Sequence, residues 1–135
     1  MLIGELAKKA DVSIDTIRYY EREGLIEPMT VRESGYREFN KSTVETIRFI
    51  VRAKDLGFSL KEIHNLLRLK NNPDTTCGEI RALAESKLAD VVAKVKTLQA
   101  MKKDLTGLLG ACANTAAPVN SCPIVDALDG KGKKK

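Results

Sequence analysis

The feature that most constrains this chain is a heptad repeat in its C-terminal half. The a and d positions follow one another at alternating steps of four and three residues, and all but one are apolar: Ala84, Leu88, Val91, Val95, Leu98, Lys102, Leu105 and Leu109. Such a pattern is typical of a helix that packs along a partner helix. Thr76 and Glu79 predict a capping box, which places Cys77 in the first turn. Two glycines weaken the far end, so we expect this long dimerisation helix to end near Ala111.

Three cysteines flank the long helix and are candidate ligands for a metal ion. Cys77 and Cys112 are 35 positions apart. They therefore lie roughly 50 Å apart along one helix and cannot share a ligand within one chain. If two copies pair antiparallel, Cys77 of one copy comes beside Cys112 and Cys122 of the other, which creates two equivalent sites per dimer. The heptad alone does not fix this antiparallel sense, and an odd number of cysteines argues against a disulfide framework.

Composition limits the class of protein. With 135 residues, of which 43% are hydrophobic and 4% aromatic, the chain predicts a small domain with a thin aliphatic core plus a long helix. The net charge of +5 falls to about +1 without the tail KGKKK, so DNA binding must be argued from motifs rather than from charge. No apolar run approaches the roughly 20 residues of a membrane span, and no signal peptide opens the chain. We expect a cytoplasmic protein without a membrane partner, and no catalytic set can be assembled, so we expect no enzyme.

The N-terminal half predicts a helix-turn-helix followed by a hairpin. Apolar spacing places a first helix over residues 3–10, and Ser13 is expected to cap a second helix over residues 14–23. Two short helices joined by a tight turn are typical of a DNA-binding helix-turn-helix. Residues 24–40 contain helix breakers and have the length of a short hairpin, or wing.

Further helices connect this lobe to the chain's end. Asn40 is expected to cap a third helix that ends at Leu56, and Ser59 with Glu62 predicts a capping box for a fourth. A last short helix is expected over residues 124–128. The fold class is therefore all-α, or mainly helical. Four parts are expected: a DNA-binding domain (residues 1–70), a dimerisation helix with its connector (71–111), a metal-binding loop with a short helix (112–130) and a basic tail (131–135).

The second helix is the expected base reader, because in a helix-turn-helix this helix enters the major groove. Several of its side chains can contact bases or phosphates, namely Thr16, Arg18, Tyr19, Tyr20 and Arg22. The two arginines share one face, whereas the second of the two tyrosines is expected to pack in the core. In the wing, Arg32 and Arg37 are expected to reach phosphates, and Tyr36 is expected to stack on the sugar backbone.

Three segments resemble the DNA-binding half of the MerR family of transcriptional regulators: IGELAKKADVSIDTIRYYEREGLI, GYREF and FIVRAKDLGFSLKEI. The cysteine set resembles the metal-sensing branch of that family. The resemblance covers residues 2–128 and implies a homodimer with winged helix-turn-helix lobes joined by an antiparallel coiled coil. It also implies that the metal-bound form bends and untwists promoter DNA so that RNA polymerase can use it. The residues implied to contact DNA are Thr16, Arg18, Tyr19, Arg32, Tyr36, Arg37 and Lys54.

The resemblance also limits the metal. In this family a serine in place of Cys77 accompanies the sensing of monovalent copper, silver and gold, so a cysteine there points to a divalent ion. A third thiolate also suits the trigonal or tetrahedral coordination of such ions. Zinc sensors of this type carry an additional cysteine directly after the second ligand, where this chain has Ala113. We therefore expect a single three-thiolate site for Cd2+, Pb2+, Zn2+ or Hg2+, with the order among these metals left open.

Two other functions would use some of the same residues. A dimeric metal-buffering protein would need the cysteines but would bind no specific DNA sequence. A thiol redox sensor would respond to peroxide instead of metal. The family's redox branch, which holds an iron–sulfur cluster with four cysteines, is disfavoured because this chain has three.

Overall fold

The computed structural model describes residues 1–27, 30–31 and 37–130. This part of the chain is mainly helical and contains one short pair of strands, which confirms the expected fold class. None of its helices is long and apolar enough to cross a membrane. The elements in chain order are α1 (Ile3–Ala10), α2 (Ile14–Arg22), β1 (Thr30–Val31), β2 (Arg37–Glu38), α3 (Ser42–Asp55), α4 (Leu60–Lys70), α5 (Cys77–Ala111), the short 3-10 helix η1 (Val119–Ser121) and α6 (Pro123–Leu128).

Helices α1 and α2 form the expected helix-turn-helix. Asp11 ends α1 in the left-handed conformation, with φ 57° and ψ 46°, which aspartate tolerates better than most residues. Ser13 then caps α2, because its side chain accepts a hydrogen bond from the backbone N–H of Thr16 at 3.0 Å. Gly24, with φ 75°, follows the end of α2 and turns the chain toward the wing.

The wing is an antiparallel pair of strands, as the hairpin prediction required. Thr30 pairs with Glu38, and Val31 pairs with Arg37. Residues 32–36 lie outside the described part of the chain. Phe39, directly after β2, is buried and exchanges two hydrogen bonds with Met1: the Met1 ammonium donates to the Phe39 carbonyl at 2.9 Å, and the Phe39 N–H donates back at 2.7 Å. The base of the wing is thereby fixed to the start of α1.

A tight corner joins α3 to α4. Gly57, with φ 94°, follows the end of α3, and its N–H donates to the Lys54 carbonyl while the N–H of Phe58 donates to the Ala53 carbonyl. This pair of hydrogen bonds is a Schellman motif, which needs a residue that tolerates positive φ. The predicted capping box of Ser59 and Glu62 then starts α4.

The start of α3 differs from the prediction. Lys41 occupies the N-cap position and makes no side-chain capping bond. The Asn40 side chain instead accepts a hydrogen bond from the N–H of Ser42 at 3.2 Å. Asn40 therefore lies one residue before the N-cap position rather than at it. An asparagine there closes a local turn in front of the helix.

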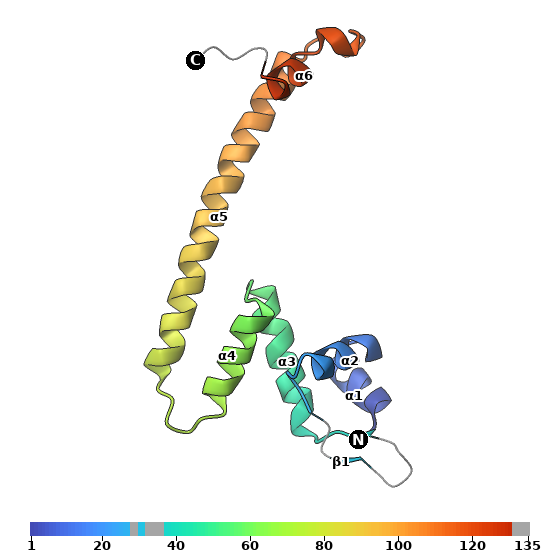
Figure 1. Ribbon diagram of the computed structural model, residues 1–135, viewed down its shortest axis with the longest axis vertical. Helices are drawn as coiled ribbons and strands as arrows, with labels where there is room; N and C mark the ends of the chain where they lie inside the picture. Colours follow the sequence, from blue (N-terminus) through green and yellow to red (C-terminus); the bar gives the residue numbers. More distant parts are fainter. Residues whose placement is uncertain (28–29, 32–36, 131–135) are drawn as a thin grey trace. The chain divides into compact units, whose positions relative to one another are not determined.

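The chain divides into two compact units, Met1–Lys87 and Leu88–Lys135. In the first unit α3 lies between α4 and the pair formed by α1 and α2 (Figure 1). Its core is aliphatic apart from two aromatic side chains and consists of Leu6, Ala7, Ala10, Ile17, Tyr20, Leu25, Ile26, Phe39, Val44, Ile47, Ile50, Ala53, Ile63, Leu66 and Leu67. Ile80 and Leu83 from the first turns of α5 pack against this core.

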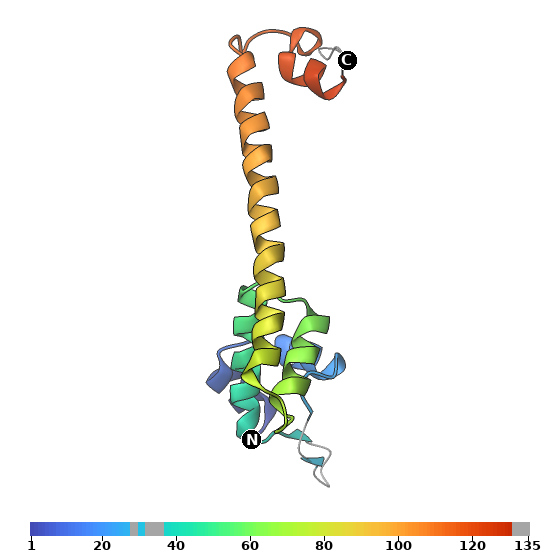
Figure 2. The same ribbon diagram turned by 90° about the vertical axis from the view of Figure 1, so that its left-hand side faces the viewer.

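Helix α5 has the bounds that the sequence predicted. Thr76 and Glu79 form the expected capping box: the N–H of Thr76 donates to the Glu79 carboxylate at 3.0 Å, and the N–H of Glu79 donates to the Thr76 hydroxyl at 3.3 Å. In the single chain, every a and d side chain of the repeat from Leu88 to Leu109 is exposed. After α5, η1 and α6 lie next to each other at the end of the second unit (Figure 2).

Candidate DNA interface and thiol ligands

Helix α2 presents a polar face and buries an apolar one. Ile17 is fully buried, and Tyr20 is 2% exposed, as expected for the second tyrosine. Burial raises the pKa of the Tyr20 hydroxyl, and the neighbouring Tyr19 and Asp55 add to this effect. Arg18 is exposed, and Tyr19 is half-buried. The buried face fixes the helix on the core, so the exposed face is presented by a rigid support.

The polar face of α2 carries contacts that orient individual side chains. The hydroxyls of Ser13 and Thr16 lie 2.8 Å apart, so Thr16 is held by the N-cap of its own helix. The guanidinium of Arg22 lies over the Tyr19 ring, 5.6 Å from its centre, in a cation–π arrangement. Arginine, threonine and tyrosine side chains held in this way are groups that proteins use to contact bases and phosphates.

The remaining predicted DNA contacts lie outside α2. Lys54 is an exposed residue near the end of α3. Arg37 belongs to β2, at the base of the wing. Arg32 and Tyr36 lie outside the described residues.

Two contacts of α4 were not predicted from the sequence. The first joins α4 to the end of α2: the Nε2–H of His64 donates to the backbone carbonyl of Glu23, at 2.7 Å. The two partners are 41 positions apart, and no local pattern connects them.

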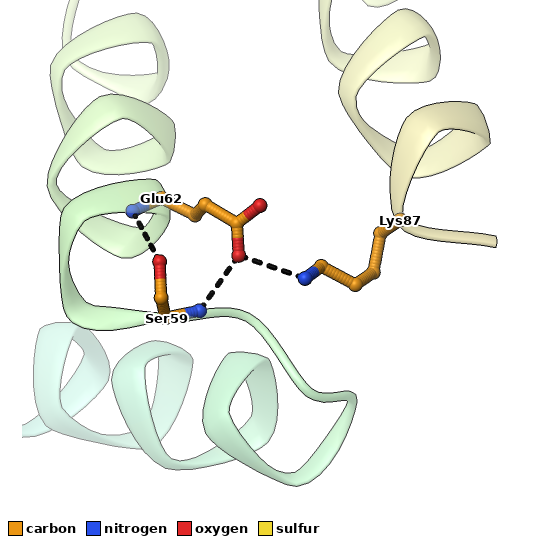
Figure 3. A network of polar contacts seen from close by, with 3 residues as sticks. All are labelled: Ser59, Glu62 and Lys87. Carbon is orange, nitrogen blue, oxygen red and sulfur yellow. Dashed lines mark hydrogen bonds and ion pairs between the residues drawn. The ribbon is translucent and has the colours of Figure 1, made fainter. Parts of the chain in front are cut away.

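The second contact joins α4 to α5. Lys87 Nζ lies 2.8 Å from Glu62 Oε1, and the same oxygen accepts the N–H of Ser59 at 2.8 Å within the capping box (Figure 3). The Lys87 hydrogen bond lowers the pKa of Glu62 from its usual 4.5 to about 2, and the backbone hydrogen bond from Ser59 acts in the same direction. Partial desolvation of the carboxylate opposes the shift. One oxygen atom therefore serves both the cap of α4 and the ion pair to α5.

The three cysteines are free thiols. Cys77 is the first residue of α5 and is exposed in the single chain. Cys112 follows the last residue of α5, and Cys122 is the N-cap residue of α6; both are half-buried. Cys77 belongs to the first compact unit, whereas Cys112 and Cys122 belong to the second. Within the described part of one chain, no three histidine, cysteine, aspartate or glutamate side chains gather as a metal site.

The winged helix-turn-helix, in which α2 exposes a polar face, defines the class of protein as a DNA-binding transcription regulator. Residues 1–70 match the MerR HTH family of regulatory proteins, and residues 44–108 match the family's "MerR, DNA binding" region. The chain belongs to the MerR family.

Relatives of the chain are similar over nearly their whole length. It is 40% identical over 128 residues to the HTH-type transcriptional regulator ZntR of Escherichia coli (strain K12), with 94% of this chain and 91% of the relative covered. It is 40% identical over 131 residues to the mercuric resistance operon regulatory protein of Serratia marcescens, with 97% and 89% covered. Among solved structures, the transcription regulator PbrR691 from Ralstonia metallidurans CH34, in complex with lead(II), is 36% identical and has a TM-score of 0.84, with 95% of this chain and 98% of that one covered.

Proposed function

We propose that the protein is a homodimeric transcription regulator that senses a divalent, thiophilic metal ion through Cys77, Cys112 and Cys122. The observation that carries this proposal is that one free thiol begins α5, a second follows its last residue and a third begins α6, while α5 exposes an apolar stripe. A relative named for mercuric resistance and a solved regulator that holds lead(II) support the metal class.

The exposed stripe of α5 supports the dimer. Leu88, Leu98 and Leu105 expose roughly three fifths of their surface in the single chain, which is unfavourable unless a partner covers them. An a/d stripe is the surface that a second copy of the same helix covers. In an antiparallel pair, the start of one α5 lies beside the end of the other, and each three-cysteine set is completed across the dimer.

The donor set limits the metal. Three thiolates suit zinc, cadmium, lead or mercury, which prefer sulfur, and they do not suit magnesium or calcium, which prefer oxygen. Ala113 follows the second proposed ligand, and Ala116 and Ala117 occupy the loop, so the loop adds no further sulfur or imidazole for a second ion. A single three-thiolate site per set is therefore proposed.

The DNA contacts are proposed from side chains of α2 that are exposed or half-buried, from Lys54, and from three residues of the wing that the resemblance implies. Arg18 and Tyr19 on α2, held against the core by Ile17 and Tyr20, are proposed to contact bases and backbone in the major groove together with Thr16. Lys54, Arg37, Arg32 and Tyr36 are proposed to contact phosphates and sugars. Metal binding would bend and untwist the bound promoter, and RNA polymerase could then use that promoter.

The function is tested by transcription in vitro from the promoter that the protein footprints. We expect one or more of Zn2+, Cd2+, Pb2+ and Hg2+ to raise the transcript level, and we expect Cys112→Ser to abolish the rise while operator binding stays within about twofold. If peroxide raises transcription and none of the metal ions does, the result would indicate a thiol redox sensor and refute the proposal. A metal-binding dimer that protects no DNA sequence would indicate a buffer and refute the proposal.

The shared site has a separate test. Mixed dimers are prepared from one Cys77→Ser chain and one chain with both Cys112→Ser and Cys122→Ser. If each site combines Cys77 of one chain with the other two cysteines of its partner, the mixed dimer keeps one complete set and binds about half the metal of the wild-type dimer. Dimers of either variant alone keep no complete set and serve as controls. A mixed dimer that binds no metal would refute the shared site.

A further inference from the structure

Helix α4 makes polar contacts with two other elements through side chains that are two positions apart. Glu62 pairs with Lys87 of α5, and His64 donates to the carbonyl of Glu23 at the end of α2. All four residues belong to the compact unit Met1–Lys87. The helix that leads toward the proposed dimer and the helix that reads DNA are therefore both bonded to one short segment of α4.

Lys87 is seated in the corner between α3 and α4. Its side chain is 12% exposed, although lysine is a surface residue by default. Its ammonium lies 5.6 Å from the centre of the Phe58 ring, and a Cβ at Gly57 would lie 4.0 Å from its Cδ. The stem thus lies along the corner while the head reaches the Glu62 carboxylate, which is the arrangement expected of a fixed contact rather than of a solvated charge.

The position of Lys87 along α5 gives this contact its importance. Lys87 is the last residue of the first compact unit, and α5 continues beyond it into the second. Another ion pair on α5, between Arg81 and Glu85 at 3.3 Å, has side chains that are 76% and 64% exposed and joins two residues of the same helix. Such an exposed pair contributes little. The contact of Lys87, in contrast, fixes α5 to a different element.

His64 connects α4 to the end of the reading helix. Glu23 is the C-cap residue of α2, and backbone carbonyls at this end of a helix lack partners within the helix. His64 supplies that partner at 2.7 Å. The segment between the two contacts is rigid, because Ile63, which lies between Glu62 and His64, is fully buried in the core.

We infer that α4 is a relay between α5 and the reading helix, with Lys87 and His64 as positioning residues that link a change in α5 to the orientation of α2. The inference rests on the proposed metal-dependent regulation and deepens it. A packed element with two contacts transmits a displacement from one contact to the other when both remain formed. Neither residue is required to touch DNA or metal.

The inference is tested with Lys87→Met and His64→Ala in the full-length protein. Met keeps an apolar stem for the Phe58 corner but loses the ammonium, and Ala removes the imidazole donor. Coupling between sites in regulated proteins typically amounts to about fivefold or more. We expect each variant to lower the ratio of metal-induced to uninduced transcript by about fivefold or more. Operator affinity without metal, and metal affinity, should both stay within about twofold of wild type.

The double variant distinguishes a relay from two independent effects. If the two effects are independent, the losses in induction ratio multiply to about 25-fold in the double variant. If both contacts belong to one relay, losing either contact already interrupts it, and the double variant has about the same induction ratio as each single variant. Lys87→Arg keeps the cation and His64→Gln keeps an amide donor, so both should restore part of the induction. Arg81→Met removes the exposed pair on the same helix and should leave induction unchanged.

The outcomes separate this inference from the proposed function. If wild-type protein shows no metal-dependent transcription, the proposed function fails and the relay fails with it. If wild type is induced and Lys87→Met and His64→Ala are induced equally well, only the relay is refuted. Loss of operator binding in step with induction would show a merely structural role and would also overturn the relay.

Discussion

Replacing Leu98 with alanine should weaken the proposed dimer strongly and leave the first compact unit unchanged. Leu98 occupies a d position near the middle of the repeat and is 60% exposed in the single chain. Complete burial of a leucine side chain contributes about 1.5–3 kcal/mol, so covering the exposed part contributes roughly 1–2 kcal/mol per chain. The change occurs twice in a symmetric dimer, which gives roughly 2–4 kcal/mol and a Kd raised roughly 30- to 700-fold.

The assay is a dilution series followed by sedimentation equilibrium, with Kd fitted for wild type and variant. Alanine favours helix at least as well as leucine, so the helix itself is not weakened. Lys96→Ala, on the same helix but outside the a and d positions, is the matched control and should leave Kd unchanged. A Leu98→Ala protein that dimerises as tightly as wild type would show that the repeat is not the dimer surface.

Three further predictions concern single polar side chains. Lys102→Leu should lower the Kd of the dimer in the same dilution series, because it removes the one charged side chain of the repeat. A raised Kd would show instead that Lys102 makes a favourable contact in the dimer. Ser13→Ala should lower the free energy of unfolding by about 1 kcal/mol, since the N-cap bond to Thr16 is lost, whereas Ser13→Asp should retain it; equal urea unfolding curves for all three proteins would contradict the cap. The low pKa of Glu62, about 2, means that its carboxylate stabilises the fold fully above its usual pKa of 4.5 and loses this effect as the pH falls toward 2. The stability difference between wild type and Glu62→Gln should therefore shrink between about pH 4 and pH 2, and a difference that stays constant over that range in urea titrations would exclude the linkage.

Features of the fold that depend on neighbours in sequence could be predicted from the sequence. The two capping boxes, Ser59 with Glu62 and Thr76 with Glu79, each use residues three positions apart, so a short pattern specifies them. The bounds of α5 follow from its capping box and its repeat for the same reason. Local hydrogen bonds of this kind depend little on how the rest of the chain packs.

The contacts that cross between elements could not be predicted in this way. Lys87 and Glu62 are 25 positions apart, and His64 and Glu23 are 41 apart, so their meeting depends on how α4 packs against α2 and α5. Asn40 shows the same limit on a small scale: the sequence predicts it as the N-cap residue of α3, whereas Lys41 occupies that position and the helix starts one residue later. The proposed cysteine site combines residues of two chains, so it depends on how two copies pair as well as on how one chain folds.

The division of α2 into a buried and an exposed face restricts how a regulator of this kind can acquire a new operator. Ile17 and Tyr20 hold the helix to the core, so substitutions there alter folding and recognition together. Asp15, Arg18 and Arg22 are exposed and can vary at little cost to stability. A library intended to retarget the protein through the proposed DNA-contacting face of α2 would therefore vary Arg18, a proposed contact, together with its exposed neighbours Asp15 and Arg22, and would keep the two buried positions.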